Sequence, residues 1–100
     1  MGLRNNTVSA SAVSGVATVG VNGQHSPMQI TSVPTSASGT GTVTARPING
    51  TGFESVFDSS GAALTFDLSA QYTFIVDGLF KDIKVTSSNS GDTFTLYAGS

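Results

Sequence analysis

Apolar and polar side chains alternate with a period of two along much of the chain. Small and apolar residues fall at odd positions from Val13 to Val21, and the alternation returns from Leu64 to Leu68, from Tyr72 to Val76 and from Thr93 to Tyr97. This period is typical of strands with one buried face. No segment repeats convincingly with the period of a helix, so we predict an all-β protein.

Two segments carry apolar residues on both faces. Ile75 lies on the face opposite Phe74 and Val76, which predicts burial on both sides of this strand. In the segment that follows, one face is expected to hold Leu79, Lys81, Ile83 and Val85, and the other Phe80, Asp82, Lys84 and Thr86.

Turn-forming residues separate the predicted strands. Pro27 and Pro34 bracket a strand at 28–33, which places it near a sheet edge or at a strand end, because proline donates no backbone hydrogen bond. Residues 34–41 are predicted as a Ser/Gly loop or irregular edge. Further strands or extended segments are predicted at 42–46 and 53–57. The turn candidates are Asn22-Gly23, Pro47–Gly52, Asp58–Gly61, Asp77-Gly78 and Ser87–Asp92.

These elements predict an antiparallel β-sandwich or a jelly-roll-like barrel of about 6–8 strands. One hundred residues suffice for one domain. The first residues are small and polar, so we predict an extended N-terminal arm at 1–11 and a single β-sandwich domain at 12–100. All eight aromatic residues lie from Phe53 onward, which predicts a core concentrated in the C-terminal half.

Charge is scarce in this sequence. Charged residues make up 10% of the chain, against about 25% in typical soluble domains. Serine and threonine together exceed a quarter of the residues. Such a surface contacts other chains without burying ions, but a β-protein can also simply be low in charge. Both explanations remain open.

Several classes of function are disfavoured by the composition. Arg4, Arg46, Lys81 and Lys84 are the only cations and the net charge is −2, so we expect no nucleic-acid partner. No apolar run approaches the ~20 residues of a membrane span, and we expect no membrane partner. The N-terminus lacks the apolar region of a signal peptide. The chain has no cysteine, which leaves the redox compartment open.

Candidate catalytic residues have simpler structural explanations. His25 is the only histidine and lies in a turn-like segment, and no G-x-S-x-G motif is present. The acid pairs Glu54/Asp58 and Asp77/Asp82 are close in sequence. However, Asp58 and Asp77 precede turn residues, Asp67 is an outward strand position, and Asp82 alternates with Lys81 and Lys84 on a solvated strand. Solvation or local salt bridging explains these acids better than catalysis does.

Sites for metals, phosphate or sugars are equally weak. The Ser87–Asp92 loop could bind Ca²⁺ through oxygen atoms, but the EF-hand pattern is absent. Gly39 and Gly41 are interpreted as loop and strand-entry residues. Tyr72 and Tyr97 are candidates for an exposed aromatic platform, or are core-edge tyrosines. We therefore assign no catalytic, cofactor-binding or metal-binding residue, and predict a protein that is not an enzyme and needs no cofactor.

Part of the chain resembles a family of viral proteins. The segments that carry the resemblance are Ser38–Ala45 (SGTGTVTA), Leu64–Gly78 (LTFDLSAQYTFIVDG), Phe80–Thr86 (FKDIKVT) and Gly91–Tyr97 (GDTFTLY). Over residues 38–100 they resemble small β-sandwich structural proteins of tailed bacteriophages in Gly/Ser/Thr-rich strands, a late aromatic core and a terminal hairpin. The resemblance implies a virion component, foremost a capsid decoration or cement protein that binds and stabilises the capsid lattice, and next a tail or fibre accessory protein.

The resemblance also implies partners and a location. The expected partners are the major capsid protein and further copies of the chain in a homo-oligomer such as a trimer. The protein would be made in the host cytoplasm and lie on the outer capsid surface. Unpaired strand edges could extend a sheet into a neighbouring chain. The alternatives are a carbohydrate-binding β-sandwich module and a small hydrolase, which would require a pocket that joins His25 to an acid and a serine.

Overall fold

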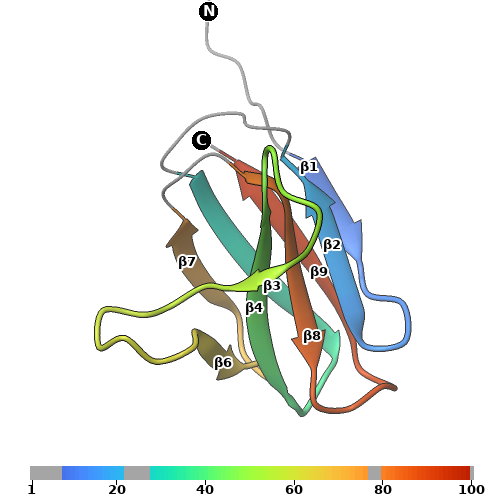
Figure 1. Cartoon of the computed structure of the whole chain (residues 1–100). Helices are drawn as coiled ribbons and strands as arrows, with labels where there is room; N and C mark the ends of the chain where they lie inside the picture. The colour runs from blue at the N-terminus through green and yellow to red at the C-terminus, as the bar shows by residue number, and fades with distance from the viewer. Residues whose placement is uncertain (1–7, 22–27, 77–79, 100) are drawn as a thin grey trace, which may run out of the picture.

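The computed structural model describes residues 8–21, 28–76 and 80–99, and its strands form two antiparallel sheets packed face to face (Figure 1). The prediction of an all-β sandwich is confirmed. The described part of the chain has no helix long and apolar enough to cross a membrane. The strands are β1 (Val8–Ser11), β2 (Val16–Gly20), β3 (Met28–Ser36), β4 (Thr40–Pro47), β5 (Glu54–Ser55), β6 (Thr65–Asp67), β7 (Tyr72–Val76), β8 (Phe80–Ser87) and β9 (Thr93–Gly99).

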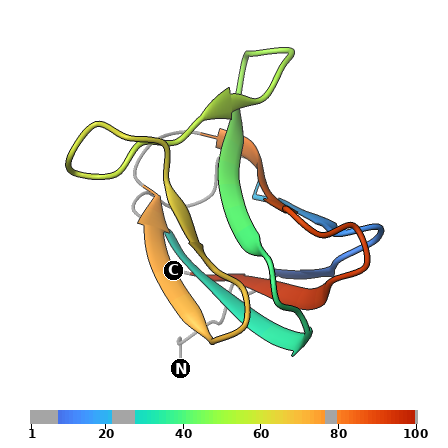
Figure 2. The ribbon, with the colours of Figure 1, turned by 90° about the horizontal axis from the view of Figure 1, so that it is seen from below.

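The strands pair in a nested order. β1 pairs with β9, β2 with β8, β3 with β7, and β4 with both β5 and β6. Two further pairings, β3 with β9 and β4 with β8, complete the sheets. Sheet A therefore has the order β1-β9-β3-β7, and sheet B has the order β2-β8-β4 with β5 and β6 along the outer side of β4. If β5 and β6 are taken as one interrupted strand, this is the order of a jelly roll, and Figure 2 shows its two layers from one end.

Strand β1 corrects the predicted arm. Residues 8–11 pair with β9, from Val8 opposite Ala98 to Ser11 opposite Thr95, and so belong to sheet A. Their small polar side chains are compatible with an edge strand, which sequence alone does not distinguish from an arm. The rest of the predicted arm, residues 1–7, lies outside the described residues, as do the predicted turns at Asn22-Gly23 and Asp77-Gly78.

Strand β3 is longer than predicted. It continues through Pro34 to Ser36, and it lies between β9 and β7 rather than at an edge. Its pairing with β7 ends at Ser32, while the pairing with β9 continues with a register shift between Pro34 and Ser36. Pro34 thus occupies a part of β3 that pairs on one side only, where a missing backbone donor is tolerated.

The core lies between the sheets and draws on both halves of the chain. The predicted concentration in the C-terminal half is right for the aromatic rings, since Phe66, Phe74 and Phe94 are buried, and wrong for Phe57, which is 63% exposed. The N-terminal half supplies smaller aliphatic residues. The buried hydrophobic residues are Ala17, Val19, Val21, Ile30, Val43, Ala45, Phe66, Leu68, Phe74, Val76, Ile83, Val85, Phe94, Leu96 and Ala98.

A register shift corrects the predicted position of Phe80. Arg46 lies opposite Asp82, but Pro47 lies opposite Phe80, so Lys81 is an extra residue on β8. A bulge of this kind reverses the side-chain alternation beyond it. Phe80 therefore packs against the core instead of sharing the outer face with Asp82 and Lys84.

Asp92 joins the connections between the sheets at one end of the sandwich. Asp92 is 7% exposed. It accepts hydrogen bonds from the Ser87 hydroxyl (2.7 Å) and from the backbone N–H groups of Gly39 (2.8 Å) and Ser38 (3.2 Å). The β3–β4 and β8–β9 connections are therefore tied to one side chain. We call Ser38, Gly39, Ser87 and Asp92 the crossover cap.

Gly39 must be glycine for this contact. A Cβ atom there would lie 2.6 Å from the Ser87 hydroxyl and 2.9 Å from the Asp92 carboxylate. The Ser87 hydroxyl, with smaller contributions from the Gly39 and Ser38 N–H groups, lowers the pKa of Asp92 although burial opposes the shift.

We expect Asp92→Asn to destabilise the protein in a pH-dependent way. Because the pKa of Asp92 is lowered in the folded state, its carboxylate stabilises the fold above the unfolded value of about 3.9. This contribution is lost as the pH falls through the folded pKa. The difference in free energy of unfolding between the unaltered protein and D92N, from urea titrations, should be large at pH 7 and smaller at about pH 3. An equal difference at both pH values would contradict this role; Glu54→Gln, at an exposed position of β5, is the control.

Gly15 is the second residue of a tight turn that carries the chain from sheet A to sheet B. Ser14 and Gly15 have positive φ angles of 54° and 77°, as in a two-residue type I′ hairpin loop. Val13 and Val16 exchange backbone hydrogen bonds of 2.8 and 3.1 Å across it. The Gly15 carbonyl also accepts a bond of 2.7 Å from the Ser87 N–H.

We expect Gly15→Ala to lower the free energy of unfolding by about 1–3 kcal/mol. The added Cβ would lie 2.7 Å from the Asn89 carbonyl oxygen and 3.0 Å from the Ser90 Cα, in a backbone conformation that alanine disfavours. Gly91→Ala is the matched control, because nothing lies within 4 Å of its Cβ position. Equal stability of the two variants in chemical denaturation would contradict this account.

Candidate association surface

Two of the acidic residues considered from the sequence, Asp58 and Asp67, accept hydrogen bonds from nearby residues. Asp58 Oδ1 accepts bonds from the Ser60 hydroxyl (2.6 Å), the Ser60 N–H (2.9 Å) and the Ala62 N–H (3.1 Å). These bonds, the Ser60 hydroxyl first, lower the pKa of Asp58. Asp67 accepts bonds from the Ser69 N–H and hydroxyl at 2.9 and 2.7 Å, which lower its pKa in turn. The turn at Asp58 is confirmed, and Asp67 also begins a turn.

Two of the candidate catalytic groups, His25 and Asp77, lie outside the described residues. Within the described ranges, no three residues among His, Cys, Asp and Glu gather closely enough to hold a metal ion. In the predicted Ser87–Asp92 loop, the carboxylate of Asp92 accepts the hydrogen bonds of the crossover cap.

Asp82 forms a salt bridge with Arg46 on the neighbouring strand β4. Phe53 lies beside this pair, with the Lys84 Nζ 4.1 Å and the Arg46 Cζ 5.4 Å from its ring centroid. The face of an aromatic ring attracts a cation that lies over it. This cluster occupies the outer face of sheet B.

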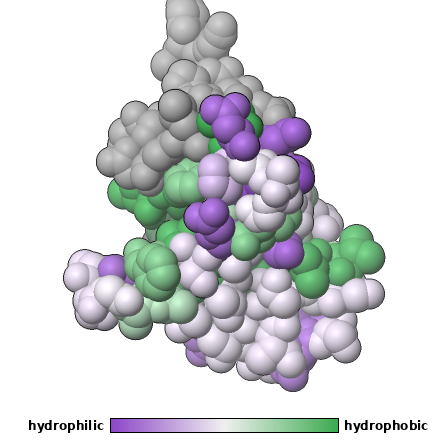
Figure 3. Space-filling model, viewed as in Figure 1, coloured by the Kyte–Doolittle hydropathy of each residue, from purple (hydrophilic) through white to green (hydrophobic). Residues whose placement is uncertain are grey.

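Charge is divided unequally between the two sheets. β1, β3, β7 and β9 of sheet A carry no Asp, Glu, Lys or Arg. In Figure 3, which views the molecule from the side of β4 and β8, hydrophilic residues stand among nearly neutral ones. The charged residues of the described ranges are on strands of sheet B or in loops: Arg46, Glu54, Asp58, Asp67, Lys81, Asp82, Lys84 and Asp92.

The outer face of sheet A is covered by hydroxyl and other uncharged side chains. Cross-strand partners form rows on it, one of which joins Ser9, Tyr97, Thr31 and Thr73. The hydroxyls of Thr31 and Thr73 are 3.0 Å apart, so one donates to the other. We call this surface the uncharged face and define it as Ser9, Ser11, Gln29, Thr31, Val33, Thr73, Ile75, Thr95, Tyr97 and Gly99.

Ile75 corrects one expectation from the sequence. It was predicted to be buried, yet its side chain is 66% exposed at the β7 edge of the uncharged face. β7 is covered by the core on one side only. The apolar residue on its other side has no cover in the described part of the chain.

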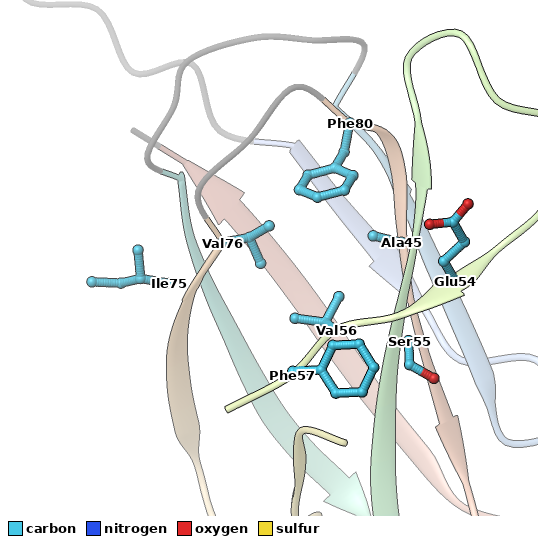
Figure 4. Close-up of a pocket in the computed structure, with 8 residues that line it drawn as sticks. All are labelled: Ala45, Glu54, Ser55, Val56, Phe57, Ile75, Val76 and Phe80. Atoms are coloured by element: carbon cyan, nitrogen blue, oxygen red, sulfur yellow. The ribbon is translucent and has the colours of Figure 1, made fainter. Parts of the chain in front are cut away.

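The sandwich is open between β7 and the β5–β6 edge. Phe66 on β6 and Tyr72 on β7 stack across this gap, with centroids 4.8 Å apart and an interplanar angle of 10°. Beside them lies a pocket of about 480 Å³. Figure 4 shows Val56, Phe57, Val76 and Phe80 around it, and Ile75 on β7 also lines it. Its remaining lining residues are Ala45, Glu54 and Ser55.

The two tyrosines do not form a joint platform. Tyr72 is on the core side of β7, and one face of its ring stacks on Phe66. Tyr97 lies on the uncharged face of β9, on the opposite side of sheet A, and is 43% exposed. A sugar could therefore not stack on both rings at once.

Comparisons with known proteins support the fold. No protein-family model matches this chain, and no curated protein matches it. Among solved structures, it is similar to a protein of the Bacillus endospore appendages, which form a novel family of disulfide-linked pili. The TM-score is 0.50, with 12% identity over 96% of this chain and 83% of that chain. At this identity the likeness concerns the β-sandwich fold alone.

Proposed function

We propose that this chain is a non-enzymatic structural protein that acts by binding protein neighbours through the uncharged face. The observation that carries the proposal is the absence of charge from all four strands of sheet A. Charged residues are depleted at the centres of protein interfaces, and tyrosine is enriched there. Tyr97 lies near the middle of the uncharged face, between Ser9 and Thr31.

The proposed setting is the outer capsid surface of a tailed bacteriophage, where the chain would decorate and stabilise the lattice. Its support is the resemblance of residues 38–100 to small virion proteins. The major capsid protein and further copies of the chain are the proposed partners. A decoration protein acts through contact area repeated by symmetry, and an uncharged face makes such contacts without desolvating ions. A tail or fibre accessory role would use the same face.

A surface appendage is a second candidate setting. The observation in its favour is the similar fold found in the Bacillus endospore appendages. Those pili are disulfide-linked, whereas this sequence contains no cysteine. Subunits of this chain would therefore associate without disulfides, again through a face that places no charges against its neighbour.

We expect Thr95→Lys to weaken binding to the native particle by at least about tenfold, because an unpaired lysine in an interface core costs more than 1.4 kcal/mol. Thr95 is on a central strand of sheet A, between Ser11 and Val33. Thr86→Lys is the matched control: Thr86 is on a central strand of sheet B, between Val16 and Thr42.

The measurement is electron microscopy of purified particles from the source of the sequence, depleted of the chain and incubated with each variant. Occupancy at symmetry-related positions of a shell would support capsid decoration, and a helical array would support an appendage. Equal occupancy for T95K, T86K and the unaltered protein would contradict the use of the uncharged face.

A further inference from the structure

β7 is the edge strand that is least protected against pairing with another chain. One side of it pairs with β3 from Tyr72 to Val76, and its other side has no strand partner in the described residues. The strand contains no charged residue, proline or bulge. These are the devices that normally prevent edge-to-edge association.

The remaining edges are blunted or joined to another strand. β5 and β6 are two and three residues long and carry Glu54 and Asp67. β1 and β2 are joined by the tight turn at Ser14 and Gly15, so these two edges are held together at one end. β7 is therefore the edge strand with the fewest features that oppose pairing with an added strand.

The side chains of β7 suit a partner with the same sequence. We propose that a second copy of this chain pairs with β7 in antiparallel orientation, about a two-fold axis at Phe74. In this register Thr73 of each copy faces Ile75 of the other, and Tyr72 faces Val76, so all five residues of the strand are paired. A two-fold axis places each strand against itself, and β7 carries no charge that would meet its own copy.

The pairing also covers exposed apolar surface. Ile75 is 66% exposed and would be covered by Thr73 of the other copy, a cross-strand pair of β-branched residues. An added strand lies about 4.8 Å from β7, over the mouth of the pocket where Phe57 is 63% exposed. This inference rests on the proposed structural function, since it names a second copy as one of the partners.

Engineered cysteines test the register directly, because the chain has none of its own. Residues opposite each other in antiparallel strands have Cα atoms about 4.5–5.5 Å apart, within the range of a disulfide. An oxidised mixture of Thr73→Cys and Ile75→Cys should therefore give a disulfide-linked dimer. Either variant alone should give several-fold less disulfide-linked dimer. In this register, residue 73 of one copy and residue 73 of the other are displaced by about 7 Å along the strands, and the same holds for residue 75.

Two outcomes would overturn the two-fold arrangement. One is no cross-linking of the mixture above the level of the single variants. The other is efficient cross-linking of Thr73→Cys or Ile75→Cys with Ser9→Cys on β1, which would indicate head-to-tail extension of sheet A.

Ile75→Lys gives an independent measurement. Because Ile75 is largely exposed, the variant should keep the thermal unfolding midpoint of the unaltered protein. Its dimer dissociation constant by sedimentation equilibrium should rise at least about tenfold. Thr18→Lys, at an exposed outward position of β2, is the control and should dimerise as the unaltered protein does. If the unaltered protein stays monomeric throughout the concentration range, the inference is overturned. The effect of T95K on particle binding tests the proposed function separately.

Discussion

The carboxylate of Asp92 fixes how the two sheets meet at one end of the sandwich. It is a buried acceptor whose donors come from the β3–β4 and β8–β9 connections. β9 and β4 leave these connections, and each is a central strand of its sheet. A shift of one residue in either strand would exchange its inward and outward side chains. The hydrogen bonds to Asp92 therefore add to the strand pairing that holds the register, on which the composition of both outer faces depends.

The outer faces of the two sheets carry different kinds of side chain. Sheet B keeps its charges in contact with one another, with Arg46 paired to Asp82 and Lys84 over Phe53. Sheet A has only hydroxyl, amide and apolar side chains. A low content of charged residues, taken from the composition alone, has more than one explanation. The described charges lie on sheet B and in the loops. This distribution sets the charged outer face of sheet B apart from the uncharged face that is proposed to bind another protein.

The sequence predicted what depends on neighbours along the chain. Alternation identified the all-β class, and the aspartate before Ser-Ser-Gly identified the turn at Asp58. Features set by a distant strand were missed. The bulge at Lys81 that turns Phe80 inward appears only opposite β4, and Val8–Ser11 becomes a strand only beside β9. The sequence did contain evidence for the uncharged face, because residues 28–36, 72–76 and 93–99 include no charged residue. This evidence predicts a surface only once these segments are known to share a sheet.

The pairing of the first described strand with the last has a practical consequence. Val8 lies opposite Ala98, so the described domain begins and ends side by side, at the end of the sandwich away from the crossover cap (Figure 1). Segments that precede Val8 and follow Gly99 therefore join the described domain at the same end. A short linker between these two positions could close the chain for circular permutation.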